Sequence, residues 1–308
     1  MADYRVCVVG ASGYAGQELL HLLRRHPLVA RIDTPDSTTG LAALADDVDA
    51  VLLATPAEFA AEWAWPLVLR GKRVVDLSGA HRAGTPAAHE HAYGFAHPHP
   101  EALATAVYGL APAPAQLAQA KLVANPGCYA NGILSALIPL HAMGWLDAQA
   151  TADVTGISGV SGAGKKPTER THFMAVAENL MPYKPLRAHQ HVVEVERAVP
   201  VRLLFVPVVA PLRRGMLISG TVPLQATVTQ RDLQELPPLD AFWRRVDQPP
   251  EVQELRDTPW ISVYYALDPP SGRLLFVTAL DNLLRGAASQ AIANLNQMWQ
   301  LPATTGIL

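Results

Sequence analysis

The residue with the clearest capacity for chemistry is a cysteine that directly follows a predicted turn. Cys128 comes after Asn125-Pro126-Gly127, which ends a short strand, and it precedes a helix predicted over 129–143. A thiol at the start of a helix lies near the positive end of the helix dipole, which favours the reactive thiolate. The other cysteine, Cys7, lies inside a predicted strand, where a free cysteine is usually a small buried apolar residue. Cys128 is therefore the candidate nucleophile, with an inert buried thiol as the alternative.

A nucleophilic thiolate also needs an acid/base partner, and two closely spaced histidines are the candidates. His189 and His191 are followed by Glu194, and a carboxylate near a histidine can fix its tautomer and raise its basicity. The spacing alone does not choose between the two histidines. An exposed polar loop is the alternative interpretation of this segment.

Glycines near the N-terminus indicate a nucleotide site. Gly10, Gly13 and Gly16 follow a strand predicted over 5–9 and open a helix. Such glycines let the backbone turn tightly and approach a pyrophosphate, and the helix N-terminus offers free N–H groups. The pattern predicts dinucleotide binding, with a turn that holds no ligand as the alternative.

The choice between NADP and NAD depends on the segment that follows this helix. An acidic residue about twenty positions after the glycines favours NAD, but the second strand region, 29–34, is poorly defined. Arg31 could add positive charge, and the hydroxyls of Ser37, Thr38 and Thr39 could bind a 2′-phosphate. The residues therefore favour NADP.

Two further segments have an anion-binding character. The Gly/Ser-rich loop 156–166 follows a predicted strand, and its backbone donors could hold an anion or the nicotinamide ribose. Arg82 follows the strand predicted over 73–77, at the end of the strand where ligands bind in parallel sheets, and could bind a phosphate or carboxylate. The alternatives are a flexible surface loop and a solvated arginine.

The elements that position these residues fall into two groups. Short strands at 5–9, 50–54, 73–77 and 121–124 alternate with helices, one of them opened by a capping box at 55–58 with proline at its first position. This alternation predicts an α/β, doubly wound parallel sheet.

After Asn125 strands predominate, which indicates a second domain with a mixed or antiparallel sheet. It would contain one helix over 230–246 and strands at 152–157, 203–209, 216–223, 261–266 and 274–279. A helix over 282–300 could return to the first domain. We therefore predict domains at 1–127 with 282–308, and at 128–281.

Composition excludes several classes of protein. The 308 residues carry a net charge of −3 without a basic stripe, so a nucleic-acid partner is not expected. Two cysteines do not make a disulfide framework, and we expect a protein of the reducing cytoplasm. We expect neither a signal peptide nor a membrane span, since the N-terminal residues lack a basic-then-apolar pattern and no long apolar run occurs, and we expect no metal.

The motifs together, in this order, resemble the N-acetyl-gamma-glutamyl-phosphate reductase family over nearly the whole chain. The segments are GASGYAG at 10–16, DLSGAHR at 76–82, YGFAHP at 93–98, NPGCYANG at 125–132, SGVSGAGKK at 158–166, HFMAVAEN at 172–179, HQHVVEVE at 189–196, PLRRG at 211–215 and DNLLRGAA at 281–288. The cysteine segment and the SGVSGAG loop are the most specific.

The resemblance implies a Rossmann domain joined to an α+β catalytic domain like that of aspartate-semialdehyde dehydrogenase. It implies NADPH as reductant, N-acetyl-L-glutamyl 5-phosphate as substrate, and a homo-oligomer, either dimer or tetramer. Cys128 would form a thioester, His191 backed by Glu194 would be the acid/base, and His189 would be the second choice.

The matching segments, together with Ser37 and Thr55 outside them, supply the expected binding residues. Those expected at the substrate are Arg82, Asn125, Ser158 and Arg214. Those expected at the cofactor are Gly10, Ser12, Gly13, Tyr14, Ala15, Gly16, Ser37, Thr55, Ser78, Gly159, Gly162 and Asn282.

Two departures from the family pattern keep other functions open. Gln190 stands where the family has an arginine between the histidines, and the segment 27–49 is shorter than usual. The alternatives are a sister reductase of aspartyl phosphate or of a carrier-linked aminoadipyl phosphate, and a non-catalytic NADP-binding regulator. An acidic carrier protein would require a basic surface on this protein. Such a surface could include Lys165, Lys166, Arg170 and Lys184.

Overall fold

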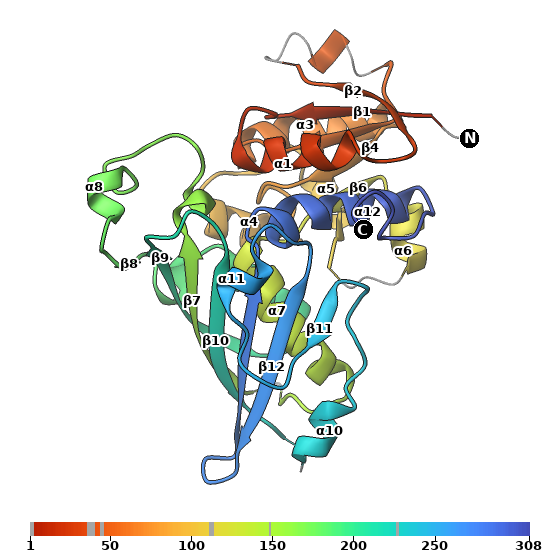
Figure 1. The fold of residues 1–308 in the computed structure, drawn as a ribbon. Helices are drawn as coiled ribbons and strands as arrows, with labels where there is room; N and C mark the ends of the chain where they lie inside the picture. The colour runs from red at the N-terminus through yellow and green to blue at the C-terminus, as the bar shows by residue number, and fades with distance from the viewer. Residues whose placement is uncertain (1–2, 36–40, 44–45, 111–113, 148, 226–227) are drawn as a thin grey trace. The chain divides into compact units, whose positions relative to one another are not determined.

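The computed structural model describes residues 3–35, 41–43, 46–110, 114–147, 149–225 and 228–308. The chain divides into two compact units, one formed by 1–127 with 287–308 and the other by 128–286. Figure 1 shows the first unit in red to yellow with the blue C-terminal helix, and the second in green to blue.

The first unit is built on a six-stranded, wholly parallel sheet in the order β2-β1-β3-β4-β6-β5. Its central strands are continuous apolar runs that are buried on both faces, as parallel strands between helices usually are. The strands are β1 (Tyr4–Val9), β2 (Val29–Asp33), β3 (Ala50–Leu53), β4 (Arg73–Asp76), β5 (Val107–Tyr108) and β6 (Leu122–Ala124).

Among the described residues, six helices accompany this sheet. They are α1 (Tyr14–Leu23), α3 (Ala57–Leu69), α4 (Pro86–Tyr93), α5 (Pro100–Thr105), α6 (Pro114–Gln119) and α12 (Ser289–Met298). The C-terminal helix α12 packs against α1 and α6 and is almost entirely buried. A π-helical turn, Leu284–Ala288, precedes α12.

The second unit contains a seven-stranded mixed sheet in the order β11-β12-β13-β10-β7-β9-β8. Its strands are β7 (Thr151–Gly159), β8 (Met181–Pro182), β9 (Arg202–Ala210), β10 (Met216–Pro223), β11 (Trp243–Arg245), β12 (Ile261–Asp268) and β13 (Arg273–Leu280). The pairs β7–β9 and β11–β12 are parallel, and the other pairs are antiparallel. The short helices and 3₁₀ turns are η1 (Val160–Ala163), α8 (Phe173–Val176), η2 (Leu186–Ala188), α9 (His191–Ala198), α10 (Gln230–Gln234) and α11 (Val252–Leu255).

Helix α7 (Cys128–Ala142) packs against β10, β12 and β13 of this sheet. Pro139 within the helix has no N–H, so it cannot donate to the carbonyl of Ser135 four residues earlier. The indole N–H of Trp243 donates to that carbonyl instead, at 2.9 Å. The Tyr265 hydroxyl donates to the next carbonyl, Ala136, at 2.7 Å. The buried side chains of Trp243 and Tyr265 thus link α7, the helix that begins with Cys128, to the sheet by hydrogen bonds.

The predicted fold class is confirmed, whereas two local predictions are wrong. The helix expected over 230–246 ends at Gln234, because Pro237 and Pro238 cannot continue it, and Trp243–Arg245 forms strand β11. The capping box expected at 55–58 does not form, because α3 begins one residue later, with Pro56 as its N-cap and no side-chain capping bond.

Within the described residues, no helix combines the length and the apolar character that crossing a membrane requires.

Candidate active site

Cys128 is the first residue of α7, at the helix N-terminus, and the residue is partly exposed. The short strand β6 ends at Ala124, and Pro126-Gly127 turns the chain into the helix. Cys7 is the opposite case, because it is fully buried inside β1. Burial, followed by the negative charge of Asp33, raises the pKa of the Cys7 thiol to about 12. Only Cys128 therefore has the surroundings of a reactive thiol.

The two histidines and the carboxylate lie together at the start of α9. His191 is the first residue of this helix, and Glu194 is on the same face one turn later, with 3.7 Å between His191 Nε2 and Glu194 Oε1. His189, His191 and Glu194 are all buried, so the segment is not an exposed polar loop. Val192 and Val195 are also buried, which explains why this short segment is helical.

The surroundings of the two histidine rings differ. The backbone N–H of His191 donates to His189 Nδ1 at 3.2 Å, so the neutral His189 ring carries its proton on Nε2. Burial and the neighbouring charge of His191 lower the pKa of His189 to about 2. His189 is therefore neutral at physiological pH, whereas His191 has a carboxylate beside it. The geometry favours His191 as the group that carries a proton.

Two tyrosines join this cluster, and sequence reasoning did not single them out. The ring of Tyr129 lies 5.7 Å from His189 and 6.0 Å from His191, measured between centroids. The ring of Tyr183 lies 5.5 Å from His189. Burial, followed by the negative charge of Cys128, raises the pKa of Tyr183 to about 12. Tyr183 therefore remains a hydrogen-bond donor beside the cysteine at neutral pH.

The placement of Tyr183 depends on pairing between segments far apart in the sequence. Strand β8 is only two residues long and pairs with β9, and the N–H of Tyr183 donates to the carbonyl of Pro207 at 3.1 Å. Phe205 of β9 lies against both Tyr129 and His189. No local spacing in the sequence could have marked Tyr183, because its position is set by this strand pairing.

In the first unit, the glycine turn between β1 and α1 has the geometry of an anion site. Gly10 has a φ of 82°, and a Cβ atom there would lie 2.2 Å from the carbonyl oxygen of Ala54. Gly13 is the N-cap of α1, and no side chain caps the helix or places negative charge in its first turn. The first N–H groups of a helix have no partner within the helix, so those of Tyr14, Ala15 and Gly16 are suited to phosphate.

Thr55 supports the same interpretation. It follows β3 beside the glycine turn, and its methyl group would lie 3.5 Å from a Cβ at Gly10. Its Oγ1 is buried and has no hydrogen-bond partner. Ser12, in the turn itself, makes polar interactions. An orphaned hydroxyl and a cradle that only glycine permits together fit a bound dinucleotide.

The region expected to meet the adenosine 2′ position is only partly described. Residues 29–33 form strand β2, although its sequence signal is weak. Arg31 is paired with Asp33 at 2.9 Å and with Asp47 at 2.5 Å, and its side chain is 42% exposed. Ser37, with Thr38 and Thr39, lies outside the described residues.

Arg82, Ser78 and Asn125 meet at the carboxyl ends of β4 and β6. Arg82 is buried and donates to the carbonyls of Asn125 at 2.7 Å and of Leu77 at 2.6 Å. Ser78 Oγ accepts from the Ala80 N–H at 3.1 Å. The Asn125 amide donates to the Ala287 carbonyl at 3.2 Å and accepts from Asn294 at 3.0 Å. Ligands bind at the carboxyl ends of the strands in such sheets. Here the side chains of Arg82, Ser78 and Asn125 are fixed at those ends by hydrogen bonds within the first unit.

The Gly/Ser-rich loop of the second unit is anchored at its start. Gly159 N–H donates to the Gly215 carbonyl at 2.9 Å, and Ser161 N–H donates to the Arg213 carbonyl at 3.2 Å. Ser158 is buried, with its hydroxyl 3.2 Å from the Gly159 carbonyl. A Cβ at Gly162 would lie 3.2 Å from Ser158 Oγ. The loop is thus ordered through Ser161 and exposed from Gly162 to Arg170.

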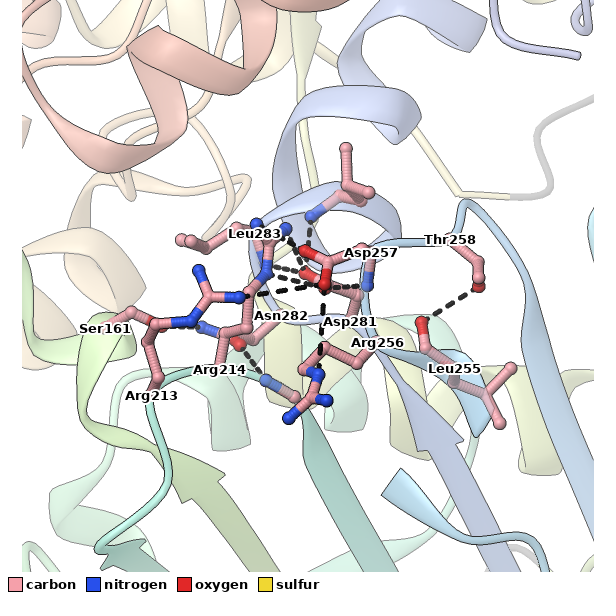
Figure 2. Close-up of polar contacts among 12 residues, drawn as sticks. Ser161, Arg213, Arg214, Leu255, Arg256, Asp257, Thr258, Asp281, Asn282 and Leu283 are labelled. Carbon is pink, nitrogen blue, oxygen red and sulfur yellow. Dashed lines mark hydrogen bonds and ion pairs between the residues drawn. The ribbon is translucent and has the colours of Figure 1, made fainter. Parts of the chain in front are cut away.

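Arg214 and Asn282 belong to one buried polar network of the second unit (Figure 2). Arg214 forms a bidentate ion pair with Asp281 at 2.7 and 2.8 Å and a further contact with Asp257 at 3.0 Å. Asn282 accepts from the Gly215 N–H at 2.6 Å and donates to Ser161 Oγ at 3.1 Å. The predicted contacts of Arg214 with substrate and of Asn282 with cofactor remain predictions.

Comparison with protein families and solved structures agrees with this architecture. Residues 33–120 match the semialdehyde dehydrogenase NAD binding domain, and residues 128–282 match the semialdehyde dehydrogenase dimerisation domain. The fold resembles aspartate semialdehyde dehydrogenase II of Vibrio cholerae complexed with ASA, with a TM-score of 0.75, 16% identity and coverage of 97% of this chain and 99% of that one. It also resembles aspartate semialdehyde dehydrogenase with NADP from Candida albicans, with a TM-score of 0.68, 15% identity and the same coverage.

Relatives similar in sequence extend over the whole chain. An N-acetyl-gamma-glutamyl-phosphate reductase of Alteromonas mediterranea is 36% identical over 99% of both chains. One of Thermus thermophilus is 36% identical over 97% of both, and one of Wolinella succinogenes is 35% identical over 100% of this chain and 98% of the relative. The chain therefore belongs to the N-acetyl-gamma-glutamyl-phosphate reductases, within the semialdehyde dehydrogenase family.

Proposed function

We propose that this protein reduces N-acetyl-L-glutamyl 5-phosphate to N-acetyl-L-glutamate 5-semialdehyde and phosphate with NADPH, a step of arginine biosynthesis. The observation that carries the proposal is the cluster in the second unit. The partly exposed cysteine at the N-terminus of α7 acts electrostatically on Tyr183, whose ring lies 5.5 Å from His189, in the segment that carries the buried His191–Glu194 pair. That arrangement is suited to covalent acyl transfer.

The covalent steps follow from the chemistry of an acyl phosphate. The sulfur of Cys128 attacks the acyl carbon, a C–S bond forms, and the bond from that carbon to the phosphate oxygen breaks to release inorganic phosphate. Hydride addition to the thioester carbon and cleavage of the C–S bond then give the aldehyde and restore the thiolate. Covalent capture divides one difficult reduction into two easier steps.

The chain's own residues manage the proton. We assign His191 to accept the proton of the Cys128 thiol on its imidazole and to return it to the sulfur once the C–S bond has broken. Glu194 stabilises the imidazolium across the 3.7 Å between Oε1 and Nε2. His189 is neutral and orients this segment by accepting the backbone N–H of His191. Tyr183 stays protonated at neutral pH, and its hydroxyl is hydrogen-bonded to that of Tyr129.

The first unit would hold the dinucleotide, with the turn from Gly10 to Gly16 at the pyrophosphate and Thr55 beside it. The chemistry that the bound dinucleotide supplies is a hydride. Arg31 would meet the 2′-phosphate of NADPH only by giving up part of its pairing with Asp33 and Asp47. Ser78, Gly159, Gly162 and Asn282 are the further residues that we expect near the cofactor.

Arg82, Asn125 and Ser158 are the residues that we expect near the substrate. The second unit would also form the contact between copies, and we propose a homodimer or homotetramer. Light scattering of the purified protein tests the oligomer, and a monomer would contradict it.

The reaction is best tested in reverse, with semialdehyde, phosphate and NADP⁺, by following NADPH absorbance. We expect turnover of N-acetylglutamate semialdehyde to exceed that of aspartate and aminoadipate semialdehydes by at least about a hundredfold in kcat/KM. Faster turnover of another semialdehyde would indicate a sister reductase. No turnover of any of them, with tight NADP⁺ binding retained, would indicate the regulator.

A further inference from the structure

We propose that Arg214 is a positioning residue for Cys128, acting through Asp281 and the turn 281–286, and that it does not bind substrate. The inference rests on the proposed function for the role of Cys128. Its physical basis is a chain of contacts within the second unit that runs from the Arg214 guanidinium to the Cβ atom of the cysteine.

The first link is the ion pair between Arg214 and Asp281. Arg214 is only 5% exposed, and Asp281 is fully buried. Nε and Nη2 of the arginine bind the two carboxylate oxygens in parallel, and Nη1 lies 3.0 Å from Asp257 Oδ1. All three guanidinium nitrogens therefore face carboxylates of the chain itself (Figure 2). A substrate anion would have to compete with the carboxylates of Asp281 and Asp257 for this arginine.

The second link is the attachment of Asp281 to its own turn. Its Oδ1 accepts from the N–H groups of Leu283 at 2.9 Å and Leu284 at 3.0 Å. Its Oδ2 accepts from the N–H of Asp257 at 2.7 Å. Asp257 has a φ of 63°, a left-handed conformation that few side chains tolerate. The carboxylate thus caps the helical turn that begins at Leu284, with Arg214 holding the carboxylate in place.

The third link joins this turn to the cysteine. The Gly286 N–H donates to the Asp281 carbonyl at 2.9 Å. A Cβ atom at Gly286 would lie 2.8 Å from Cys128 Cβ and 3.4 Å from Cys128 Cα. One helical turn later, the Asn131 amide donates to the Arg285 carbonyl at 2.9 Å. The turn therefore contacts the first turn of α7 at two points, and one of them is the nucleophile.

The far end of the same turn is anchored separately. Arg285 is 1% exposed, forms an ion pair with Asp240, and lies over the ring of Phe242 with its guanidinium carbon 4.9 Å from the centroid. With Arg214 at one end and Asp240 at the other, the backbone at Gly286 has little freedom to move. Displacing it would move the sulfur, and a misplacement of about 1 Å costs on the order of a hundredfold in rate.

The test measures the alkylation of Cys128 by iodoacetamide between pH 6 and 9, quantified by peptide mass spectrometry with Cys7 as the internal unreactive thiol. This readout needs neither substrate nor cofactor, so it is independent of whether the proposed reaction is correct. The matched control is Arg213→Gln, because Arg213 is the adjacent arginine, its side chain is 70% exposed, and its contact with the network is a long, solvent-exposed one of 3.6 Å to Asp257. We expect the control to retain the wild-type rate within about twofold.

For Arg214→Gln we expect a roughly tenfold or greater fall in alkylation rate and a displaced pH profile, with Arg214→Lys intermediate because it retains charge without the bidentate fork. In the reductase assay kcat should fall while KM for the acyl phosphate stays within about threefold. A KM increase of about tenfold or more at unchanged kcat would overturn the proposal, and so would alkylation equal to that of the control.

A second variant covers the case in which Arg214→Gln does not fold. Gly286→Ala leaves the ion pair intact and adds one methyl group against Cys128. We expect it to slow alkylation of Cys128 by about tenfold or more in a folded protein. Wild-type alkylation kinetics in Gly286→Ala would show that the turn does not position the sulfur and would overturn the proposal.

Discussion

At the scale of single residues, the two histidines of the cluster differ in whether their charge can change. His189 receives the His191 N–H on Nδ1, and its pKa is lowered to about 2 by burial and by the charge of His191. It therefore cannot accept a proton at the pH of the cell. His191 has the Glu194 carboxylate beside it, which makes it our candidate for proton transfer.

This difference predicts unequal effects of mutation. His191→Asn should lower kcat by about a hundredfold or more, because general acid–base catalysis is removed. It should also remove the limb of the pH–rate profile that this imidazole produces. His189→Asn should lower kcat by less than about tenfold and keep that limb, because an asparagine oxygen can still accept the His191 N–H.

The measurement is the pH dependence of kcat for both variants, with circular dichroism to verify folding. Loss of the same limb in His189→Asn, with the limb retained in His191→Asn, would reverse the assignment.

At the scale of elements, the glycine turn between β1 and α1 is the part of the first unit that we propose binds the cofactor. Gly10 requires glycine for two separate reasons, a φ of 82° and the 2.2 Å approach of a Cβ to the Ala54 carbonyl oxygen. Gly71 has the same φ of 82° but no atom within 4 Å of its Cβ position. Comparing alanine substitutions at Gly10 and Gly71 therefore separates the cost of backbone strain from the cost of steric contact.

We expect Gly71→Ala to cost about 1 kcal/mol in the free energy of unfolding, from the left-handed conformation alone. Gly10→Ala should cost roughly 3 kcal/mol or more and weaken NADPH binding by at least about tenfold, because the turn must open. Urea unfolding and fluorescence titration with NADPH measure the two effects. Equal losses in both variants would show that the steric contact at Gly10 does not matter.

Elements with a strong local pattern could be predicted from sequence, and those set by distant contacts could not. Strand β10 has the predicted bounds, 216–223, because its residues alternate between buried and half-buried. Helix α9 was not predicted, because only eight residues carry its apolar face. The prediction of one helix over 230–246 was wrong because it followed the apolar residues on either side of Pro237-Pro238. The two prolines, which end a helix, should have counted for more.

The candidate site divides in the same way. Cys128 and the histidine pair lie in short local motifs, so sequence alone could select them. Tyr183 reaches the cluster only through the pairing of β8 with β9. Arg214 finds its partner Asp281 at a separation of 67 residues, and no spacing rule indicates that such an arginine is already paired.

At the scale of the whole molecule, buried histidines make folding sensitive to acid. His97 is buried, and its pKa is lowered from 6.5 to about 4 by burial and by the charges of His81, His89 and His99. His189 behaves in the same way, with a pKa of about 2. Below pH 6.5 the unfolded chain binds protons at these residues while the folded protein does not. Stability is therefore present above pH 6.5 and falls as the pH drops toward the folded values.

Each such histidine should lower the free energy of unfolding by about 1.4 kcal/mol per pH unit between pH 6 and pH 4.5. His97→Gln should reduce the slope by about that amount, because it removes one of the titrating groups. Urea unfolding of both proteins at several pH values measures the slope. Identical slopes, or stability that rises as the pH falls, would contradict the prediction.

The central claim is that Cys128 carries the acyl group. Incubating the protein with N-acetylglutamyl phosphate in the absence of NADPH, followed by rapid acid quenching and peptide mass spectrometry, tests it most directly. We expect one acyl adduct, on the peptide that contains Cys128, sensitive to hydroxylamine and absent from Cys128→Ser, which should bind NADPH normally but lose at least about a thousandfold in kcat. Reduction by Cys128→Ser at the wild-type rate, or an adduct on another residue, would contradict the claim.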